Sequence, residues 1–425
     1  MVESYLREGM DADATFSLYI RPTDDRPWFV ALGVHRVLEI LDGFRYGPQE
    51  IEYLRTQGFS DQALDWLASF EPSGDIHAVH DGTVVLANEP IVEITAPIAV
   101  AQLLETAVIN LTQFSTLVAT KAARVAMAAR GRPVADFGFR RAQGLETGIE
   151  AALAAYVGGG LTTSNVEAGR RHGIEIVGTM AHSFVQSFDD EIEAFRSFAR
   201  DHPGNTTLLV DTYDTLEGVR KAIVVAREMR EARHELRAVR LDSGDLGALA
   251  KASRKLLDAA GFPDVRILAS GGLDERKIGD LLEAGAPIDA FGVGTDLVVS
   301  KDRPALDIAY KLVAYDGEPR AKYSEEKATL PGAKQIFRTG GPDRDVLGLR
   351  GEALGGTALL EPVWRDGERL RAFDLEATRE RVRRELDLLP ERWRRPPYPR
   401  DAPEPRPSDD LQALADRLAL EHQTP

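Results

Sequence analysis

The sequence predicts an α/β protein with a (β/α) barrel in the middle of the chain and a smaller α+β domain built from both chain ends. Between about residues 133 and 300, short apolar runs alternate with helical stretches, which is the rhythm of βα units. The first hundred residues instead mix strands and short helices, and strand-and-turn character returns after about residue 310. We therefore expect the two ends to pack together as one domain.

These changes in the pattern of strands and helices predict three parts of the chain. Residues 1–110 and 310–375 form the discontinuous α+β domain, and residues 111–309 form the barrel that carries the active site. Residues 376–425 form a charged helix at Glu376–Leu389, a proline-rich linker at Pro390–Pro407 and a short final helix.

The composition limits the function. The 425 residues include no cysteine, which excludes disulfides, thiolate metal sites, iron–sulfur clusters and a cysteine nucleophile. The net charge of −16 argues against a nucleic-acid or membrane-surface partner, but it leaves room for a local basic pocket. No signal peptide and no apolar run of about 20 residues is found, so we expect a cytoplasmic protein.

The elements of the first part follow from periodicity. Ala14–Ile20 alternates and predicts a half-buried strand, and a helix starts at Val34 and stops at Gly43. Thr83–Leu86 and Ile91–Thr95 predict two further strands, and residues 99–130 have a strongly apolar helical pattern.

The barrel elements follow in alternation. The predicted strands are Val134–Phe137, Ile174–Val177, Thr207–Val210, Ala238–Leu241, Val265–Ala269 and Ala290–Val293. The helices between them include Thr215–Arg233, Leu246–Ala260 and Glu275–Ala284, and Lys334–Arg338 and Gly356–Glu361 are strand-like beyond the barrel. Nearly every barrel strand ends in a polar cluster, and the carboxyl ends of barrel strands carry the active site in this architecture.

Two glycine turns follow the last two barrel strands. They contain Gly271 and Gly272 in the first turn and Gly294 and Thr295 in the second. Backbone amides in such turns bind phosphate oxygens, so the pair favours a phosphate site over ordinary tight βα turns.

The cluster Arg240–Asp245 is more specific. Arg240 and Asp242 share a face of a strand, and Ser243, Gly244 and Asp245 follow. One cation and two carboxylates suit a phosphorylated sugar with Mg²⁺ at Asp242 and Asp245. An internal ion pair, with Asp245 capping the next helix, explains the pattern equally well.

His182 and Phe137 each allow two interpretations. His182 follows a strand in a loop of small residues, where an imidazole can act as nucleophile or base, although a lone histidine is more often structural. Phe137 can stack on a flat ring while Arg140 meets a carboxylate, but an ordinary core phenylalanine explains it at least as well.

Read in order, these clusters resemble the nicotinate phosphoribosyltransferase family, the type II phosphoribosyltransferases. The resemblance covers roughly residues 30 to 340. The matching stretches are Asn88–Pro90, LLETAVINL (Leu103–Leu111), LVATKAAR (Leu117–Arg124), DFGFRRAQG (Asp136–Gly144), TSNVEAG (Thr163–Gly169), GTMAHSFV (Gly178–Val185), LLVDTYDT (Leu208–Thr215), VRLDSGDL (Val239–Leu246), ASGGLDE (Ala269–Glu275), FGVGTDLV (Phe291–Val298) and LPGAKQIFR (Leu330–Arg338).

The resemblance implies a fold, a reaction and partners. It implies an irregular (β/α) barrel with an open-faced α+β sandwich, and a homodimer. Nicotinate, 5-phosphoribosyl 1-diphosphate and ATP would give nicotinate mononucleotide, diphosphate, ADP and phosphate in NAD biosynthesis, with Mg²⁺ on the diphosphate.

The resemblance also implies roles for single residues. His182 matches the histidine that ATP phosphorylates, Thr179 a nicotinate contact, and Phe137 the aromatic side chain on the pyridine ring. Arg140 and Arg240 match the arginines that hold substrate anions. The residues that resemble the phosphoribosyl diphosphate site are Asp242, Ser243, Gly244, Asp245, Gly271, Gly272, Gly294 and Thr295.

Ser164 bears on the choice of substrate. Nicotinamide-using relatives carry an aspartate at this position, which would repel the carboxylate of nicotinate, so serine favours the acid. Three alternatives remain at this point. They are a nicotinamide- or quinolinate-using phosphoribosyltransferase, a barrel isomerase or aldolase acting on a sugar phosphate, and a non-catalytic member that binds metabolites. The second needs a Schiff-base lysine or an acid–base pair at the mouth, and Lys277 falls inside a predicted helix.

One departure from the family pattern lies at the start. Family members carry an Asp-Leu-Tyr strand before the segment that matches Tyr5–Met10, and its tyrosine forms the second side of the ring clamp. This sequence starts after it. Either the start was assigned too late, the chain was trimmed, or half the clamp is missing, in which case we expect weaker nicotinate binding and a weaker dimer.

Overall fold

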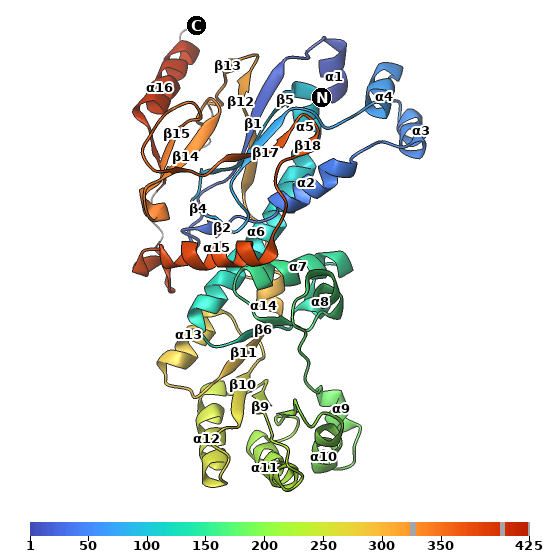
Figure 1. Ribbon diagram of the computed structural model, residues 1–425, viewed down its shortest axis with the longest axis vertical. Helices are drawn as coiled ribbons and strands as arrows, with labels where there is room; N and C mark the ends of the chain where they lie inside the picture. The colour runs from blue at the N-terminus through green and yellow to red at the C-terminus, as the bar shows by residue number, and fades with distance from the viewer. Residues whose placement is uncertain (324–328, 400–403, 424–425) are drawn as a thin grey trace. The chain divides into compact units, whose positions relative to one another are not determined.

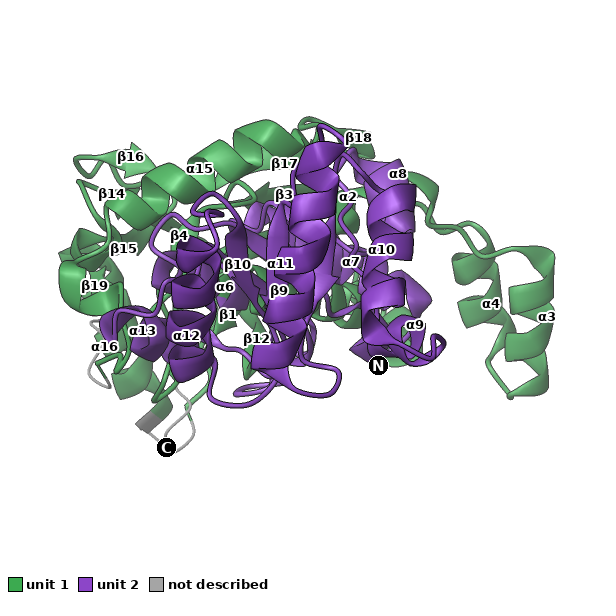
Figure 2. Ribbon diagram, turned by 90° about the horizontal axis from the view of Figure 1, so that it is seen from below, with its two compact units in different colours: residues 1–120, 305–425 green, residues 121–304 purple. Residues whose placement is uncertain are grey.

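The computed structural model describes residues 1–323, 329–399 and 404–423. The chain forms two compact units, which Figure 2 distinguishes by colour: unit 1 is Met1–Thr120 with Ala305–Pro425, and unit 2 is Lys121–Pro304. Unit 1 therefore takes segments from both chain ends, while the boundaries expected from the sequence stay predictions. No helix among the described residues combines the length and hydropathy needed to cross a membrane.

Unit 1 is built on sheets that are antiparallel except for one parallel pair, Val346–Leu347 with Arg406–Pro407 (Figure 1). The larger sheet has the strand order β13-β12-β1-β5-β3-β17-β18. Its strands are β1 (Asp13–Ile20), β3 (Asp75–Ala78), β5 (Pro90–Pro97), β12 (Ile308–Tyr315), β13 (Glu318–Pro319), β17 (Glu361–Arg365) and β18 (Glu368–Arg369). A second sheet has the order β16-β14-β15-β19, and a two-stranded sheet pairs β2 with β4. These strands are β14 (Lys334–Arg338), β15 (Val346–Leu349), β16 (Thr357–Ala358), β19 (Arg406–Pro407), β2 (Phe29–Val30) and β4 (Val84–Val85).

Strand β1 corrects one prediction. Its apolar face, including Leu18, packs in the core as expected, but Ser17 on the opposite face is also completely buried. The strand lies in the middle of the sheet between β5 and β12. The expected half-buried strand is therefore wrong, because alternation in the sequence reports side-chain polarity and not whether a second layer covers the polar face.

Some helices of unit 1 lie near predicted positions, namely those that begin at Val34, Leu375 and Asp409, whereas no position was predicted for the helices at Val2–Arg7, Pro48–Thr56 and Asp61–Ala68. The helices of this unit are α1 (Val2–Arg7), α2 (Val34–Gly43), α3 (Pro48–Thr56), α4 (Asp61–Ala68), α5 (Ile98–Leu103), α15 (Leu375–Asp387) and α16 (Asp409–Gln423). Helix α6 (Glu105–Ala128) continues from unit 1 into unit 2. Within the proline-rich segment, Trp393 is fully buried and its carbonyl oxygen accepts a 3.0 Å hydrogen bond from Trp28 Nε1. Residues 400–403 of that segment lie outside the described residues.

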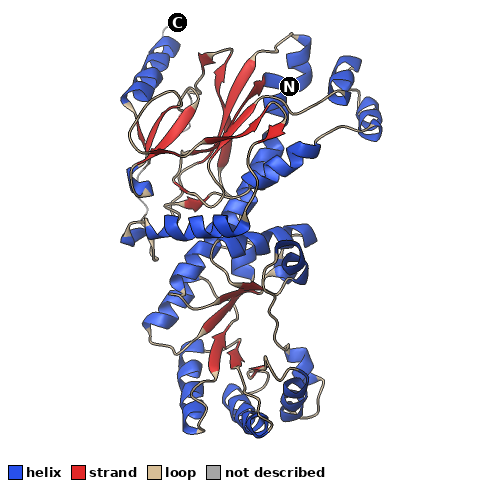
Figure 3. Cartoon of the chain, viewed as in Figure 1, coloured by secondary structure: helices blue, strands red, loops and turns tan. Residues whose placement is uncertain are grey.

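Unit 2 contains the six-stranded parallel sheet β7-β6-β11-β10-β9-β8, drawn in red in the lower part of Figure 3. The strands are β6 (Val134–Asp136), β7 (Thr162–Thr163), β8 (Thr207–Leu209), β9 (Ala238–Leu241), β10 (Arg266–Ala269) and β11 (Ala290–Val293). The helices are α7 (Leu145–Val157), α8 (Val166–His172), α9 (His182–Gln186), α10 (Glu191–Asp201), α11 (Thr215–Glu231), α12 (Leu246–Ala259), α13 (Glu275–Glu283) and α14 (Thr295–Val298). The predicted α/β class is confirmed, and the structure shows a curled parallel sheet in place of the predicted barrel.

The parallel sheet forms half of a barrel rather than a closed one. Its outer strands in the described residues are β7 and β8. The predicted strand at Ile174–Val177 makes only an isolated bridge between Thr163 and Ile176. Ile176 is 53% exposed, so its burial provides little driving force for a full strand there. By contrast, the apolar side chains of β8–β11 are deeply buried, and this core holds the carboxyl ends of the strands at one edge.

Candidate functional site

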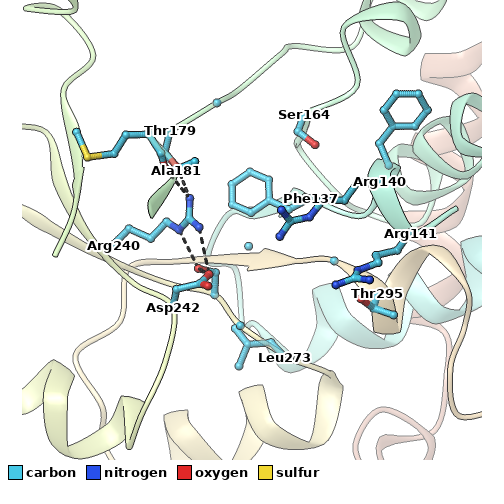
Figure 4. A pocket seen from close by; sticks show the side chains of 18 residues that line it. Phe137, Arg140, Arg141, Ser164, Thr179, Ala181, Arg240, Asp242, Leu273 and Thr295 are labelled. Carbon is cyan, nitrogen blue, oxygen red and sulfur yellow. Dashed lines mark hydrogen bonds and ion pairs between the residues drawn. The ribbon is translucent and has the colours of Figure 1, made fainter. Parts of the chain in front are cut away.

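A pocket of about 470 Å³ lies in unit 2, where the strands of the parallel sheet end (Figure 4). Because the carboxyl ends of parallel strands meet at one edge, loops far apart in sequence contribute to the same hollow. The lining residues are Phe137, Phe139, Arg140, Arg141, Ser164, Gly178, Thr179, Met180, Ala181, Arg240, Asp242, Ser270, Gly271, Gly272, Leu273, Gly292, Gly294 and Thr295.

Arg240 is the centre of the polar network in this pocket. Its Nη1 donates to Thr179 Oγ1, its Nε donates to Ser270 Oγ at 3.0 Å, and its Nη2 donates to Asp242 Oδ1 at 3.1 Å. Figure 4 shows the guanidinium between Thr179 on one side and Asp242 on the other. The side chain is only 14% exposed, so these partners hold the cation in one orientation.

Asp242 stays ionised in this network. Burial opposes the charge, but the hydrogen bond from Ser270 Oγ at 2.5 Å and the positive charge of Arg240 outweigh it. The pKa of Asp242 therefore lies below its ordinary value of 3.8. The arginine and the aspartate form a preorganised pair of opposite charges at the end of β9.

Asp211, two residues after the end of the neighbouring strand β8, supports Asp242. Its Oδ2 accepts hydrogen bonds from the backbone N–H of Asp242 at 3.0 Å and from Ser243 Oγ at 2.5 Å. Its Oδ1 is buried and has no hydrogen-bond partner among the described residues. One carboxylate oxygen beside the pocket is thus left available.

His182 lies next to this pair, at the first position of α9. Its Nδ1 is 3.1 Å from Thr212 Oγ1, while its Nε2 is 3.8 Å from Asp242 Oδ2, too far for a hydrogen bond. The side chain is 41% exposed. Thr212 therefore holds Nδ1, while Nε2 faces Asp242 without a hydrogen bond.

Phe137 forms the apolar wall. Its backbone N–H donates to Val293 O at 2.8 Å, and a Cβ atom at Gly292 would lie 2.4 Å from its ring. The Arg240 guanidinium carbon lies 5.6 Å from the ring centroid, within cation–π range. The missing side chain at Gly292 thus makes room for the ring inside the pocket.

The turn around Phe137 is held by Asp136. Its carboxylate accepts hydrogen bonds from the Gly138 N–H at 2.7 Å and from Thr163 Oγ1 at 2.9 Å, and its carbonyl oxygen accepts from the Ser164 N–H at 2.9 Å. Burial raises the pKa of the Asp136 carboxyl. The Asp136 hydrogen bonds place Ser164 and Phe137 at the same pocket.

The two glycine turns form the remaining wall. Gly271 has a φ of +89°, and Gly272 has a φ of +61° with its carbonyl oxygen 2.5 Å from Lys277 Nζ. Gly294 caps helix α14, which begins at Thr295. Glycine turns of this kind can present backbone N–H groups to an anion.

The structure brings most of the predicted residues to this pocket and leaves others outside it. Those that line it are Phe137, Arg140, Ser164, Thr179, Arg240, Asp242, Gly271, Gly272, Gly294 and Thr295; those that do not are His182, Ser243, Gly244 and Asp245. Asp245 accepts a 3.0 Å hydrogen bond from the Ala248 N–H and caps α12. Both features of the ion-pair alternative, the Arg240–Asp242 pair and this cap, are present.

The prediction assigned no role in the site to Ser270, Asp136 or Asp211. Each stands in a polar cluster at the end of a predicted strand, and that position is the signal that could have identified it. Apart from the Gly138 N–H, which binds Asp136 locally, the side-chain partners Thr163, Arg240 and Ser243 lie 27 to 32 residues away, so no local pattern shows those hydrogen bonds.

Two family models match the chain. The N-terminal domain of nicotinate phosphoribosyltransferase matches residues 1–113, and the nicotinate phosphoribosyltransferase family model matches residues 133–335.

Curated relatives agree with these matches. The chain is 49% identical over 397 residues to a nicotinate phosphoribosyltransferase of Mycobacterium tuberculosis, covering 92% of this chain and 85% of the relative. It is 39% identical over 348 residues to a nicotinate phosphoribosyltransferase of Bacillus subtilis, covering 80% and 71%.

Solved structures share the fold. Human nicotinic acid phosphoribosyltransferase superposes with a TM-score of 0.85 at 27% identity, covering 98% of both chains. A nicotinate-nucleotide pyrophosphorylase from Pyrococcus furiosus superposes with a TM-score of 0.75 at 25% identity, covering 91% of this chain and 92% of the other.

Proposed function

Because this chain belongs to the nicotinate phosphoribosyltransferase family, we propose that it joins nicotinate to 5-phosphoribosyl 1-diphosphate, giving nicotinate mononucleotide and diphosphate for NAD biosynthesis. One observation carries this assignment to the site. An aromatic wall, a fixed arginine–aspartate pair and two glycine turns line a single pocket. These groups match a flat ring, the ribose centre and the phosphate groups.

Nicotinate binds against Phe137. The ring stacks on the phenyl face, Thr179 and Ser164 lie beside it, and Arg140 or Arg240 meets the carboxylate. The pyridine nitrogen is unprotonated at neutral pH and attacks without a base from the protein.

The phosphoribosyl group binds across the turns. The 5′-phosphate takes the backbone N–H groups of Gly271, Gly272, Gly294 and Thr295. The nitrogen lone pair forms the bond to ribose C1 while the C1–O bond breaks and diphosphate leaves with the electron pair. Positive charge develops on the sugar in this step, and the Asp242 carboxylate stabilises it.

Mg²⁺ fits the site only together with the substrate. The described residues hold no group of three or more side chains suited to a metal ion. Mg²⁺ bound through a diphosphate needs only one or two carboxylates, which Asp242 and the buried Oδ1 of Asp211 offer. When bound, Mg²⁺ neutralises charge on the departing diphosphate. Asp245, which was also predicted to bind the metal, supplies a further carboxylate only if it leaves its helix cap.

ATP reacts with His182 in this proposal. We propose that Nε2 attacks the γ-phosphorus of ATP, ADP leaves, and water later cleaves the N–P bond to release phosphate. The support is geometric, since Thr212 holds Nδ1 and Nε2 faces Asp242 without a hydrogen bond. We further propose a cytoplasmic homodimer, which light scattering of the purified chain and fractionation of cells will test.

The test measures product formation with three bases. Purified protein is incubated with 5-phosphoribosyl 1-diphosphate, Mg²⁺ and nicotinate, nicotinamide or quinolinate, each with and without ATP. We expect nicotinate mononucleotide as the main product, a rate increased by ATP, and ³²P from γ-labelled ATP on His182 but not on the His182→Ala variant. Turnover of nicotinamide or quinolinate in preference to nicotinate would overturn the substrate assignment. No turnover of any base would indicate the metabolite-binding alternative.

A further inference from the structure

Four charged side chains form a largely buried cluster that joins α6 to the segments after β10 and β11. Lys121 Nζ lies 2.6 Å from Glu275 Oε2 and 2.8 Å from Asp302 Oδ1. Arg124 lies 2.8 Å from Glu275 Oε1 and 3.4 Å from Asp302 Oδ2. Two cations from α6 thus bridge two carboxylates from different segments, and the formal charges cancel.

The cluster is set apart by its burial. The side chains of Lys121, Arg124 and Glu275 are each 2% exposed, and only Asp302, at 30%, reaches solvent. Burying charges is unfavourable by itself, so a buried ion cluster is weak evidence for a gain in stability. None of the four side chains lines the pocket.

The carboxylates are attached to the segments that form the phosphate wall. Glu275 is the first residue of α13 and follows Gly271–Leu273, which lines the pocket. Asp302 follows α14, the helix that starts at Thr295, also in the lining. Figure 1 labels both helices. The same pair of cations therefore ties the turn after β10 to the segment after β11.

We propose that Lys121 and Glu275 are positioning residues that, with Arg124 and Asp302, set the spacing of the two glycine turns. This inference rests on the proposed function, in which those turns take the 5′-phosphate. Backbone N–H groups of both turns must point to the same phosphate. A displacement of one turn by about 1 Å would therefore weaken binding and slow the reaction. The cluster explains the cations of the stretch LVATKAAR, Lys121 and Arg124, for which the reaction has no direct use.

The test compares Glu275→Gln and Asp302→Asn with a control. Both variants keep the side-chain shape and remove one negative charge. Glu93→Gln is the control, because Glu93 is a fully buried carboxylate in unit 1 that is paired with Lys334 at 3.4 Å and with Arg350. Asp302→Asn removes the charge of the most exposed residue in the cluster, so its folding should be affected less. It therefore provides the test if Glu275→Gln does not fold.

We expect the KM for 5-phosphoribosyl 1-diphosphate to rise about tenfold in the two cluster variants, while the KM for nicotinate changes less than about twofold. Calorimetric titration with 5-phosphoribosyl 1-diphosphate, without nicotinate, should show the same weakening. A purely structural cluster would lower Tm in all three variants and leave both KM values unchanged. That result would overturn the inference. If the wild-type protein makes no nicotinate mononucleotide, the proposed function fails, and the titration still decides whether the cluster affects phosphoribosyl binding.

Discussion

A Cβ atom at Gly271 would lie 1.8 Å from the carbonyl oxygen of Asp242, so the two strand ends β9 and β10 touch at a point where only glycine fits. Gly271 also has a φ of +89°, which side chains with a Cβ rarely adopt. The glycine turn and the Arg240–Asp242 pair are therefore one rigid piece of the pocket wall.

Gly271→Ala tests this contact. We expect the free energy of unfolding to fall by about 1–3 kcal/mol from backbone strain alone, and kcat/KM for 5-phosphoribosyl 1-diphosphate to fall about 100-fold as the turn moves. Gly279→Ala, inside α13 with open space around the added methyl group, is the matched control and should leave activity unchanged. Equal activities of the two variants would contradict the role of the contact.

Arg240→Lys tests the fixed guanidinium. A lysine ammonium cannot reproduce the geometry that reaches Thr179, Ser270 and Asp242 together, so we expect kcat/KM for nicotinate to fall about 100-fold or more. Arg237→Lys is the control, because the Arg237 side chain is exposed and its described hydrogen bond goes to Asn205, away from the pocket lining. Steady-state kinetics measures both, and wild-type kinetics in the Arg240→Lys variant would exclude a specific role for the guanidinium.

Phe137→Leu tests the ring wall. Loss of aromatic stacking is worth about 0.5–1.5 kcal/mol, so the KM for nicotinate should rise about 2- to 13-fold while the KM for 5-phosphoribosyl 1-diphosphate stays constant. Phe137→Tyr keeps the ring and should restore nicotinate binding. A parallel rise of both KM values in the leucine variant would indicate a collapsed turn instead of lost stacking.

Ser164→Asp tests the choice between acid and amide. A carboxylate beside the ring repels nicotinate and accepts a hydrogen bond from the NH₂ group of nicotinamide. We expect the KM for nicotinate to rise about tenfold or more, and nicotinamide turnover to become measurable. Ser164→Asn is the uncharged control and should keep the preference for nicotinate. If the aspartate variant keeps the wild-type preference for nicotinate over nicotinamide, residue 164 does not determine that preference.

Asp242→Asn tests the ionised carboxylate through the pH dependence of stability. The pKa of Asp242 is lower in the folded protein than its ordinary value of 3.8, so its ionisation stabilises the folded state above that pH. This contribution disappears as the pH falls through the lower folded pKa. Urea unfolding is measured between pH 3 and 7. Near neutrality the free energy of unfolding of the asparagine variant should be lower than that of the wild type, and this difference should shrink below about pH 4. A difference in the free energy of unfolding that does not change with pH would mean that the Asp242 charge does not stabilise the folded state.

Much of the site could be predicted from the sequence. The strands Ala238–Leu241 and Ala290–Val293 lie where periodicity places them, and the polar residues after them reach one edge, because parallel strands in βα units all end on the same side. The glycine turns and Arg240 could be identified from local pattern for the same reason. Residue type and strand direction were sufficient for these features.

The remaining features depend on long-range packing. Thr179, Ser270 and Asp242 meet at Arg240 from three separate segments, and Asp245, three residues beyond Asp242, turns away to cap α12. Ile174–Val177 does not extend the sheet, and the polar face of β1 is buried. Local sequence sets the periodicity and conformation of each element. Which polar groups become partners, and which faces a second layer covers, depends on distances between segments that exist only once the core has packed.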